Sequence, residues 1–169
     1  MKTLFKKILL LALFVVCSNF TAQAQYVTIP DANFRVFLQQ SYSGCFNGQG
    51  LMDTTCTAVV AAANMYCSNQ GIASLEGVQY FDGLQRLYCN NNQLTSLPAL
   101  PATLQYLYCY NNQLTSLPAL PATLQRLYCN NNQLTSLPAL PAALQYLDCD
   151  TNQLTSLPAL PATLQYFYC

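Results

Sequence analysis

Cysteine is the residue type in this sequence that is best suited to bind a metal or to act as a nucleophile. The chain has nine cysteines and no histidine. A zinc site needs ligands that converge on one point, and a thiol nucleophile needs a basic partner. Cysteines that recur every 20 residues form a line instead, so we predict that they are small buried hydrophobic side chains. This row consists of Cys89, Cys109, Cys129, Cys149 and Cys169, with Cys67 before it.

Asp148 and Asp150 are a second arrangement with catalytic potential. On a strand their carboxylates would share one face and lie roughly 7 Å apart, which resembles the pair in inverting glycoside hydrolases. An open ribbon of strands, however, provides neither a cleft nor the burial that raises a carboxyl pKa. The sequence also lacks a glycine-rich phosphate loop and a paired metal motif. We therefore predict no catalytic, cofactor-binding or metal-binding residue, and no enzymatic activity.

The first 24 residues have the composition of a secretory signal peptide. Lysines at positions 2, 6 and 7 precede an apolar run over residues 8–17, and Ala-Gln-Ala at 22–24 is a typical cleavage site. We predict cleavage before Gln25 and a secreted or outer-surface location. The apolar run is too short to span a bilayer, so no transmembrane segment is expected in the mature chain. Acylation of Cys17, as in a lipoprotein, is the alternative, although the bulky Val16 precedes it.

Removal of this segment changes the charge of the chain. The full sequence has six basic and six acidic residues, and without the lysines three arginines face six carboxylates. This mildly acidic balance argues against a nucleic acid as partner. Export also implies an oxidising compartment. Residues 43–53 are rich in glycine and are predicted to form a loop. Cys45 and Cys56 bracket this cap loop outside the cysteine row, and we predict a disulfide between them.

Residues 84–163 contain four copies of a 20-residue unit, followed by a partial copy. In the first copy Leu87 and Cys89 alternate with polar or aromatic residues, which predicts a strand with one buried face. Pro98 and Pro101 disfavour a helix and predict an extended, polyproline-like return. Such a period predicts a solenoid whose coils stack on each other. Its predicted core positions are Leu84, Leu87, Cys89, Leu94, Leu97 and Leu100, and its predicted buried asparagine ladder is Asn92, Asn112, Asn132 and Asn152.

The chain is predicted to divide into three parts. Residues 1–24 are the signal peptide, and residues 25–63 are a small helical N-terminal cap. Residues 64–169 are the repeat array, with an entry coil at 64–83, four repeats at 84–163 and a partial repeat at 164–169. In the cap, Asp31 is a plausible N-cap for a helix that contains Phe34, Phe37 and Leu38, and a second short helix is expected within residues 54–63.

The pattern Leu84-x-x-Leu87-x-Cys89-x-x-Asn92-x-Leu94 resembles the leucine-rich repeat consensus. The tail Leu-Pro-Ala-Leu-Pro-Ala is similar to the short repeats of secreted bacterial effectors and surface proteins. Residues 29–34 and 72–78 resemble the N-terminal cap of internalin-like surface proteins. In such proteins an acidic loop follows the cap helix, but residues 47–53 here keep almost no carboxylates, so we expect no calcium site. The chain stops within a strand, and we expect it to be a fragment of a longer protein.

The outward strand positions are the candidate binding residues. Tyrosine and arginine are enriched in protein interfaces, so we predict that this face binds a protein or a surface glycan, in adhesion or host interaction. The tyrosines could instead only stabilise the sheet by cross-strand packing. A structural spacer in a larger surface protein and a secreted effector are therefore alternative functions. The candidate residues are Arg86, Tyr88, Tyr106, Tyr108, Tyr110, Arg126, Tyr128, Tyr146, Asp148, Tyr166 and Tyr168.

Overall fold

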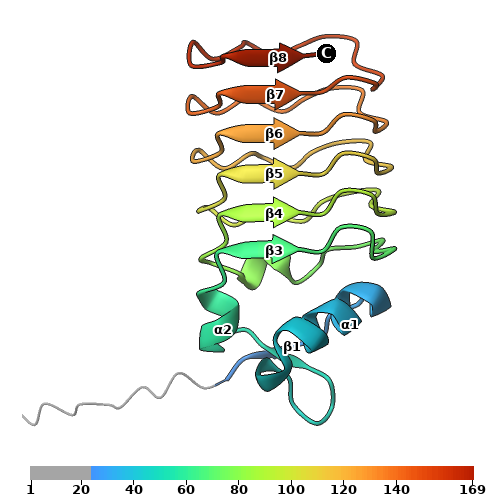
Figure 1. Cartoon of the computed structure of the whole chain (residues 1–169), viewed down its shortest axis with the longest axis vertical. Helices are drawn as coiled ribbons and strands as arrows, with labels where there is room; N and C mark the ends of the chain where they lie inside the picture. Colours follow the sequence, from blue (N-terminus) through green and yellow to red (C-terminus); the bar gives the residue numbers. More distant parts are fainter. Residues whose placement is uncertain (1–23) are drawn as a thin grey trace, which may run out of the picture.

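The computed structural model describes residues 24–169, so the predicted signal peptide and Cys17 lie outside the described residues. Its main feature is one sheet of six parallel strands, in which each strand pairs with its neighbours in sequence. The strands are stacked along the long axis of the molecule (Figure 1). From β4 onward, paired residues are 20 positions apart in every case. The strands are β3 (Asn64–Tyr66), β4 (Arg86–Tyr88), β5 (Tyr106–Tyr108), β6 (Arg126–Tyr128), β7 (Tyr146–Asp148) and β8 (Tyr166–Tyr168).

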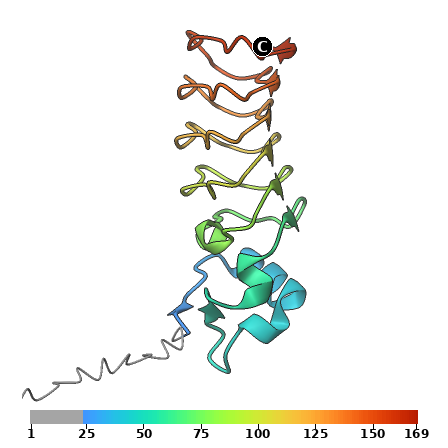
Figure 2. The same ribbon diagram turned by 90° about the vertical axis from the view of Figure 1, so that its left-hand side faces the viewer.

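Each coil has a strand on one side and a proline-containing segment on the other. The middle residue of a strand, such as Leu87, is buried, while its two neighbours face outward. This alternation follows from the two-residue period of a strand. The return segments contain neither helix nor strand, because Pro98 and Pro101 lack the N–H group that either structure needs. Seen from the side, the strands line one edge of the column (Figure 2). The predicted solenoid with parallel strands on one face is therefore confirmed.

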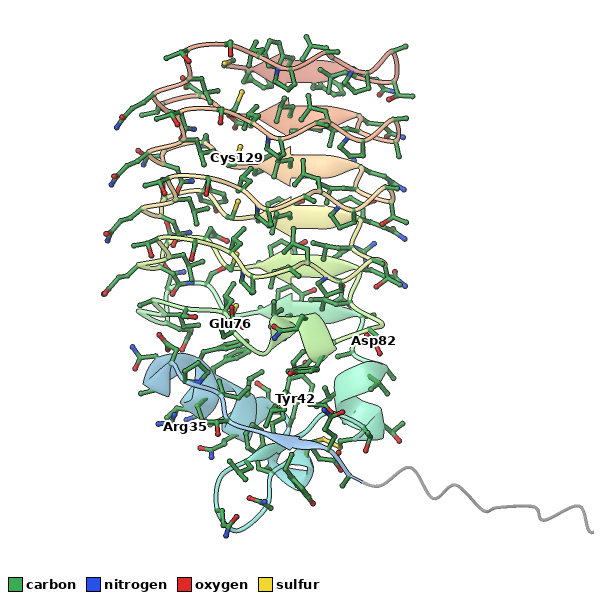
Figure 3. All side chains as sticks on the ribbon, turned by 180° about the vertical axis from the view of Figure 1, so that it is seen from behind. Arg35, Tyr42, Glu76, Asp82 and Cys129 are labelled. Atoms are coloured by element: carbon green, nitrogen blue, oxygen red, sulfur yellow. A yellow bond between two sulfur atoms is a disulfide. The ribbon has the colours of Figure 1, made fainter. Side chains whose placement is uncertain are left out.

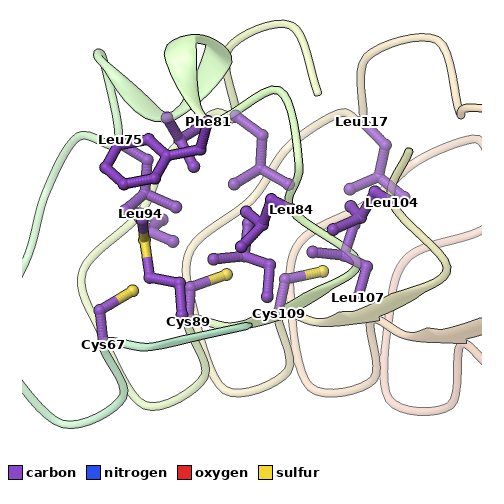
Figure 4. Packing of buried hydrophobic residues seen from close by; sticks show 14 of the residues in the cluster. Cys67, Leu75, Phe81, Leu84, Cys89, Leu94, Leu104, Leu107, Cys109 and Leu117 are labelled. Atoms are coloured by element: carbon purple, nitrogen blue, oxygen red, sulfur yellow. The ribbon is translucent and has the colours of Figure 1, made fainter. Parts of the chain in front are cut away.

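The core is one continuous column of leucine and cysteine side chains. Leu84, Leu87, Cys89 and Leu94 have no exposed surface, and the equivalent residues of the next two coils are buried in the same way. Cys67, Cys89 and Cys109 lie in one line beside these leucines (Figure 4). Leu100 is an exception to the prediction, because it is only partly buried against the core. It lies between Pro98 and Pro101 in the return segment, at the edge of the core.

The asparagine that follows each strand links neighbouring coils. The amide nitrogen of Asn112 donates to the carbonyl oxygens of Cys89 and Cys109, each at 3.1 Å, and its oxygen accepts from the Leu94 N–H at 3.0 Å. The backbone leaves the strand ladder here, so the side chain satisfies groups that strand pairing does not reach. Asn132 repeats this pattern one coil later. The hydrogen bonds of the predicted asparagine ladder are therefore confirmed, with equivalent bonds at Asn92 and Asn152. Its burial is less complete than predicted, since only Asn132 is buried and the other three asparagines are partly exposed.

Residues 25–63, the cap, cover the start of the column. The carboxylate of Asp31 accepts from the Phe34 N–H at 2.8 Å, which makes it the N-cap of the first helix as predicted. Its other oxygen accepts from the N–H groups of Ala73 and Ser74, and so joins the helix to the first coil. Residues 43–53, which the sequence predicts as a loop, also hold a short 3-10 helix and a strand. The cap elements are β1 (Tyr26–Val27), α1 (Ala32–Ser41), η1 (Ser43–Cys45), β2 (Met52–Asp53, antiparallel to β1) and α2 (Thr57–Val60).

A disulfide joins the two halves of the cap. It links Cys45, at the end of η1, to Cys56, immediately before α2, with their Cα atoms 5.5 Å apart. The sulfur–sulfur bond is visible beside α2 in Figure 3, where the Cys129 sulfur lies inside the column. This is the cysteine pair that the sequence predicts. The bond closes a short loop around β2, where strand contacts alone are few.

The junction between cap and column depends on a glycine. The N–H of Gly83 donates to the carbonyl oxygen of Val60 at 2.8 Å, which brings the two backbones together. A Cβ atom at Gly83 would lie 2.7 Å from that same oxygen. Glycine is therefore required by close backbone approach at the end of the entry coil, which also contains the short 3-10 helix η2 (Val78–Tyr80).

Candidate binding surface

The strand face consists of the outward side chains of β4 to β8 together with Tyr110 and the equivalent Asp150, two residues after β5 and β7. Because the strands pair in register, equivalent residues form two columns that run along the axis. The first column is Arg86, Tyr106, Arg126, Tyr146 and Tyr166, and the second is Tyr88, Tyr108, Tyr128, Asp148 and Tyr168. The structure thus brings all eleven predicted binding residues onto one side of the solenoid.

Tyrosine rings of the second column stack face to face. The ring centroids of Tyr88 and Tyr108 are 4.4 Å apart with an interplanar angle of 7°, and those of Tyr108 and Tyr128 are 4.5 Å apart at 12°. This spacing is close to the distance between neighbouring strands, so in-register pairing alone brings the rings into contact. The flat faces of these rings are therefore covered by each other, which leaves their edges and hydroxyl groups as the parts that a partner can reach.

The stack changes column where Asp148 replaces tyrosine. Tyr146, from the first column, places its ring 4.5 Å from the ring of Tyr128, in the position that a tyrosine at 148 would fill. Its ring is also tilted against those of Tyr166 and Tyr168, at 5.7 and 5.9 Å. The aromatic surface is therefore continuous from β4 to β8 despite the substitution at Asp148.

The first column contains an aromatic ring between two positive charges. The guanidinium carbon of Arg86 lies 4.9 Å from the centroid of the Tyr106 ring, and that of Arg126 lies 5.4 Å from the same centroid. Cation–π attraction of this kind contributes about 0.5–1 kcal/mol at an exposed site. It holds both guanidinium groups in place on the strand face, and Arg86 also donates to the side-chain oxygen of Asn64 at 3.2 Å.

Close packing changes the acidity of the groups on this face. Partial burial and the neighbouring phenols of Tyr88 and Tyr128 raise the pKa of Tyr108 to about 12. Burial also raises the pKa of Tyr128, and it raises the pKa of the Asp148 carboxyl group, where the charge of Asp150 adds to the effect. The phenols therefore remain neutral hydrogen-bond donors and acceptors at neutral pH.

The strand face is only slightly hollowed. A depression of about 180 Å³ lies at its C-terminal end, lined by Arg126, Tyr128, Gln145, Tyr146, Gln165 and Tyr166. Its lining consists of phenol, amide and guanidinium groups, which can form hydrogen bonds with a bound molecule. Such a shallow, tyrosine-lined surface is suited to contact with another molecule.

The cysteine row has the properties of core side chains. Burial raises the pKa of the Cys109 thiol to about 12 and that of Cys89 well above its usual value, so both thiols are neutral and unreactive in the folded chain. The Cys89 thiol donates to the Tyr108 carbonyl oxygen at 3.4 Å. Cys169, in contrast, is exposed, because β8 is the edge strand of the sheet and has a neighbouring coil on one side only. Within residues 24–169 no three acidic or cysteine side chains are grouped as metal ligands.

Two features of this side of the molecule were missed by the sequence reasoning. Tyr66 extends the ring stack by one strand, with its centroid 4.9 Å from that of Tyr88. Aligning residues 64–67 with 86–89 would have identified it, because both segments end in tyrosine and cysteine. The second feature is a row of exposed asparagines, Asn91, Asn111 and Asn131, which have positive φ angles and are joined by side-chain hydrogen bonds. The asparagine-rich turn was the available signal.

Comparison with known families adds to this geometry. The overlapping segments 82–122, 102–141 and 122–162 match the family described as leucine rich repeats, in units of two copies. The fold is a leucine-rich repeat solenoid. No curated protein sequence matches the chain. In the part of the chain that the structure describes, no helix has the length and apolar character needed to cross a bilayer.

Solved leucine-rich repeat structures are similar to this solenoid. A Shigella effector leucine-rich repeat domain is 34% identical with a TM-score of 0.62, and the match covers 65% of this chain and 50% of that one. The leucine-rich effector protein YopM from Yersinia pestis is 27% identical with a TM-score of 0.53, covering 76% and 42%. The chain therefore spans half or less of the length of these similar structures.

Proposed function

We propose that this chain is a non-catalytic protein-binding module that is exported from the cell, and that its strand face contacts the partner. The observation that supports this most directly is the continuous tyrosine and arginine surface on β4 to β8. Large, rigid, amphipathic side chains of this kind supply contact area at a low entropic cost. A leucine-rich repeat module with such a face has the form of an interaction surface rather than a reaction site.

The orientation of the rings favours a protein over a glycan. Sugar rings usually pack on the flat face of an aromatic side chain. In the second column those flat faces are covered by neighbouring rings at 4.4–4.5 Å. What remains accessible is a row of ring edges and hydroxyl groups, which can exchange hydrogen bonds with a peptide backbone. A surface glycan is therefore the second candidate ligand.

The similar solved structures indicate two biological settings. The Shigella and Yersinia proteins are named as effectors, so an exported effector is one proposal. The predicted signal peptide and the cap pattern support the other, a secreted or surface-attached protein in adhesion or host interaction. The activity of a whole longer protein does not follow from the half that is matched.

The spacer alternative is favoured by the ring stack itself. Each stacked aromatic pair contributes about 0.5–1.5 kcal/mol beyond its buried area, so the tyrosines would also serve an array with no ligand. A useful test must therefore separate binding from stacking. Tyr110 permits this, because its ring makes no stacking contact in the described residues and the equivalent position in other repeats is asparagine or aspartate.

The test compares three immobilised forms of the exported chain against extracts of cell-surface proteins. The unchanged chain is expected to retain a specific partner, the variant Tyr108→Ser/Tyr110→Ser/Tyr128→Ser to retain none, and Tyr110→Asn to retain less while unfolding at the same temperature as the unchanged chain. Circular dichroism checks folding of all three. Equal retention by the triple variant would disprove the proposal, and loss of retention after periodate treatment of the extract would assign the ligand to a glycan.

A further inference from the structure

The charges on the strand face are separated along the solenoid axis. The two arginines of the face, Arg86 and Arg126, lie on β4 and β6, and its two carboxylates, Asp148 and Asp150, lie on and just after β7. The face is therefore positive over β4 to β6 and negative at β7, the next strand. The other residues of the two columns are tyrosines.

The arginine charges are held in place but not neutralised. Among residues 24–169, neither Arg86 nor Arg126 forms an ion pair with a carboxylate, and their contacts are the Tyr106 ring and the Asn64 amide. Arg35, the other described arginine, differs, because it donates to the carbonyl oxygen of Ile29 at 2.7 Å inside the cap. Arg126 is exposed and Arg86 is partly exposed, so neither charge is neutralised and both can be reached by a partner.

The carboxylates at the other end also lack a positive neighbour. The Asp148 carboxylate accepts only from the backbone N–H of Asp150, at 3.3 Å, and no ion pair involves either residue within the described chain. Strand pairing places Asp148 between Tyr128 and Tyr168 in the second column. Two adjacent carboxylates without a cation attract basic groups on an approaching molecule.

We propose that the partner is a protein segment of mixed charge that lies along the solenoid axis. This inference rests on the proposed protein-binding function. Its acidic side chains pair with Arg86 and Arg126, and basic side chains further along pair with Asp148 and Asp150. The tyrosine edges between these ends contact its backbone. The charges on this face therefore set both the identity and the direction of the segment.

The spacing of the arginines limits the form of the acidic part. Both guanidinium groups flank one ring, so they lie no more than about 10 Å apart, in keeping with two strand spacings of about 4.8 Å. In a polyproline-type segment, residues i and i+3 share a face about 9.3 Å apart. In a helix, residues i and i+7 share a face about 10.5 Å apart. Two carboxylates at one of these spacings can reach both arginines at once.

A uniform polyanion, such as a sulfated glycan or a nucleic acid, fits this face less well. Only two positive charges are present on the face. Asp148 and Asp150, which lie one strand from Arg126 and three strands from Arg86, would repel a polyanion bound to the arginines. The mature chain is also acidic, with three arginines against six carboxylates. Electrostatic complementarity therefore selects a partner with both signs of charge.

The experiment uses synthetic peptides as probes of the exported chain. The block peptide carries two glutamates at i and i+3 in a proline-rich stretch, then two lysines, and the scrambled peptide has the same composition with the charges alternating. A third peptide replaces both glutamates by lysine, and a heparin oligosaccharide is the polyanion probe. Binding is measured by titration calorimetry at low and at physiological salt, since contacts between exposed charges weaken as salt rises.

The block peptide is expected to bind at least about tenfold more tightly than the scrambled peptide and the heparin probe. The variant Arg86→Glu/Arg126→Glu is expected to lose this preference and to bind the all-lysine peptide instead, which shows that it remains folded. Equal binding of block and scrambled peptides, no binding of the block peptide at millimolar concentration, or tighter binding of heparin would overturn the inference.

The failure of this inference can be told apart from the failure of the proposed function. If a protein partner is retained by Arg86→Glu/Arg126→Glu but lost by the triple tyrosine variant, the face binds protein without using its charge pattern. The inference is then wrong and the proposed function stands. If the triple tyrosine variant also retains the partner, the strand face is not the binding surface and both are wrong.

Discussion

At the scale of single residues, the repeat depends on a polar side chain more than on any one leucine. Asn112 satisfies two carbonyl oxygens and one N–H group that belong to two adjacent coils. No other residue type of that size offers a donor and an acceptor in this arrangement. The sequence predicts this role correctly, because asparagine recurs at one fixed position after each strand.

Replacement of Asn112 by alanine is expected to lower the free energy of unfolding by about 2 kcal/mol, because it leaves partly buried backbone groups without partners. Urea unfolding followed by circular dichroism measures the change. Gln113→Ala is the matched control, since Gln113 is exposed and its side chain makes no hydrogen bond in the structure, and its effect should stay within about 0.5 kcal/mol. Similar effects of the two substitutions would contradict the role of the ladder.

Buried thiols are expected to make the protein sensitive to alkali. Burial raises the pKa of Cys67 and of Cys109 to about 12, above the value near 9 that a thiol has in the unfolded chain. Stability is fully present below pH 9, and it falls between pH 9 and 12, because there only the unfolded state releases these protons. Each such thiol contributes a slope of about 1.4 kcal/mol per pH unit in this range.

Thermal unfolding at a series of pH values tests this expectation. The melting temperature should be nearly constant between pH 7 and 8.5 and should then fall steeply. The variant Cys109→Ala should lose stability at neutral pH but show a shallower decline in alkali. An identical slope in the variant would show that the Cys109 thiol does not contribute.

At the scale of elements, regular parts of the chain were more predictable than the cap. Four near-identical copies repeat the same pattern, so strand, buried positions and return segment could be derived from the two-residue alternation and the prolines. The cap offers one copy only, and its short β1 and β2 strands and η1 depend on contacts between distant segments, such as Gln25 with Thr54. The strand face was predicted by the same alternation, but the shift of the stack to Tyr146 was not, because it depends on side-chain packing around Asp148.

The contact between the cap and the first coil should be sensitive to one methyl group. Gly83→Ala is expected to lower the free energy of unfolding by about 2 kcal/mol, since the new Cβ would meet the backbone of Val60 and Ala61 and neither can move freely. Gly48→Ala, where a Cβ meets nothing within 4 Å, should change it by less than about 0.5 kcal/mol. Chemical denaturation of both variants makes the comparison, and equal stabilities would show that the junction adapts.

At the scale of the whole molecule, stability is distributed along one dimension. Each strand contacts only its sequence neighbours, so an inner coil is supported on both sides and an outer coil on one. The exposed fractions follow this order. Leu127 in β6 has no exposed surface, whereas the equivalent Phe167 in β8 is 39% exposed.

Amide hydrogen exchange should therefore be graded along the axis. The backbone N–H groups of β4 to β6 are expected to exchange most slowly, those of β7 faster, and those of residues 154–169 fastest, because local opening can start at an exposed coil without disturbing the rest. Mass spectrometry of peptic peptides after labelling measures the rates. Uniform protection across all coils would show that the array unfolds as a single unit.

Strand pairing in steps of 20 residues also constrains how such a gene can change in length. Recombination between identical units removes or adds whole coils, and the hydrophobic spine tolerates either. The guanidinium groups do not tolerate every such change, because only the coil that contains Tyr106 separates Arg86 from Arg126. Loss of the single unit that contains Tyr106 would set Arg86 directly beside Arg126, roughly 4.8 Å away, where like charges repel. Loss of the unit that contains Arg126 or of the one that contains Tyr146 creates no such pair, so the effect on the face depends on which coil is lost.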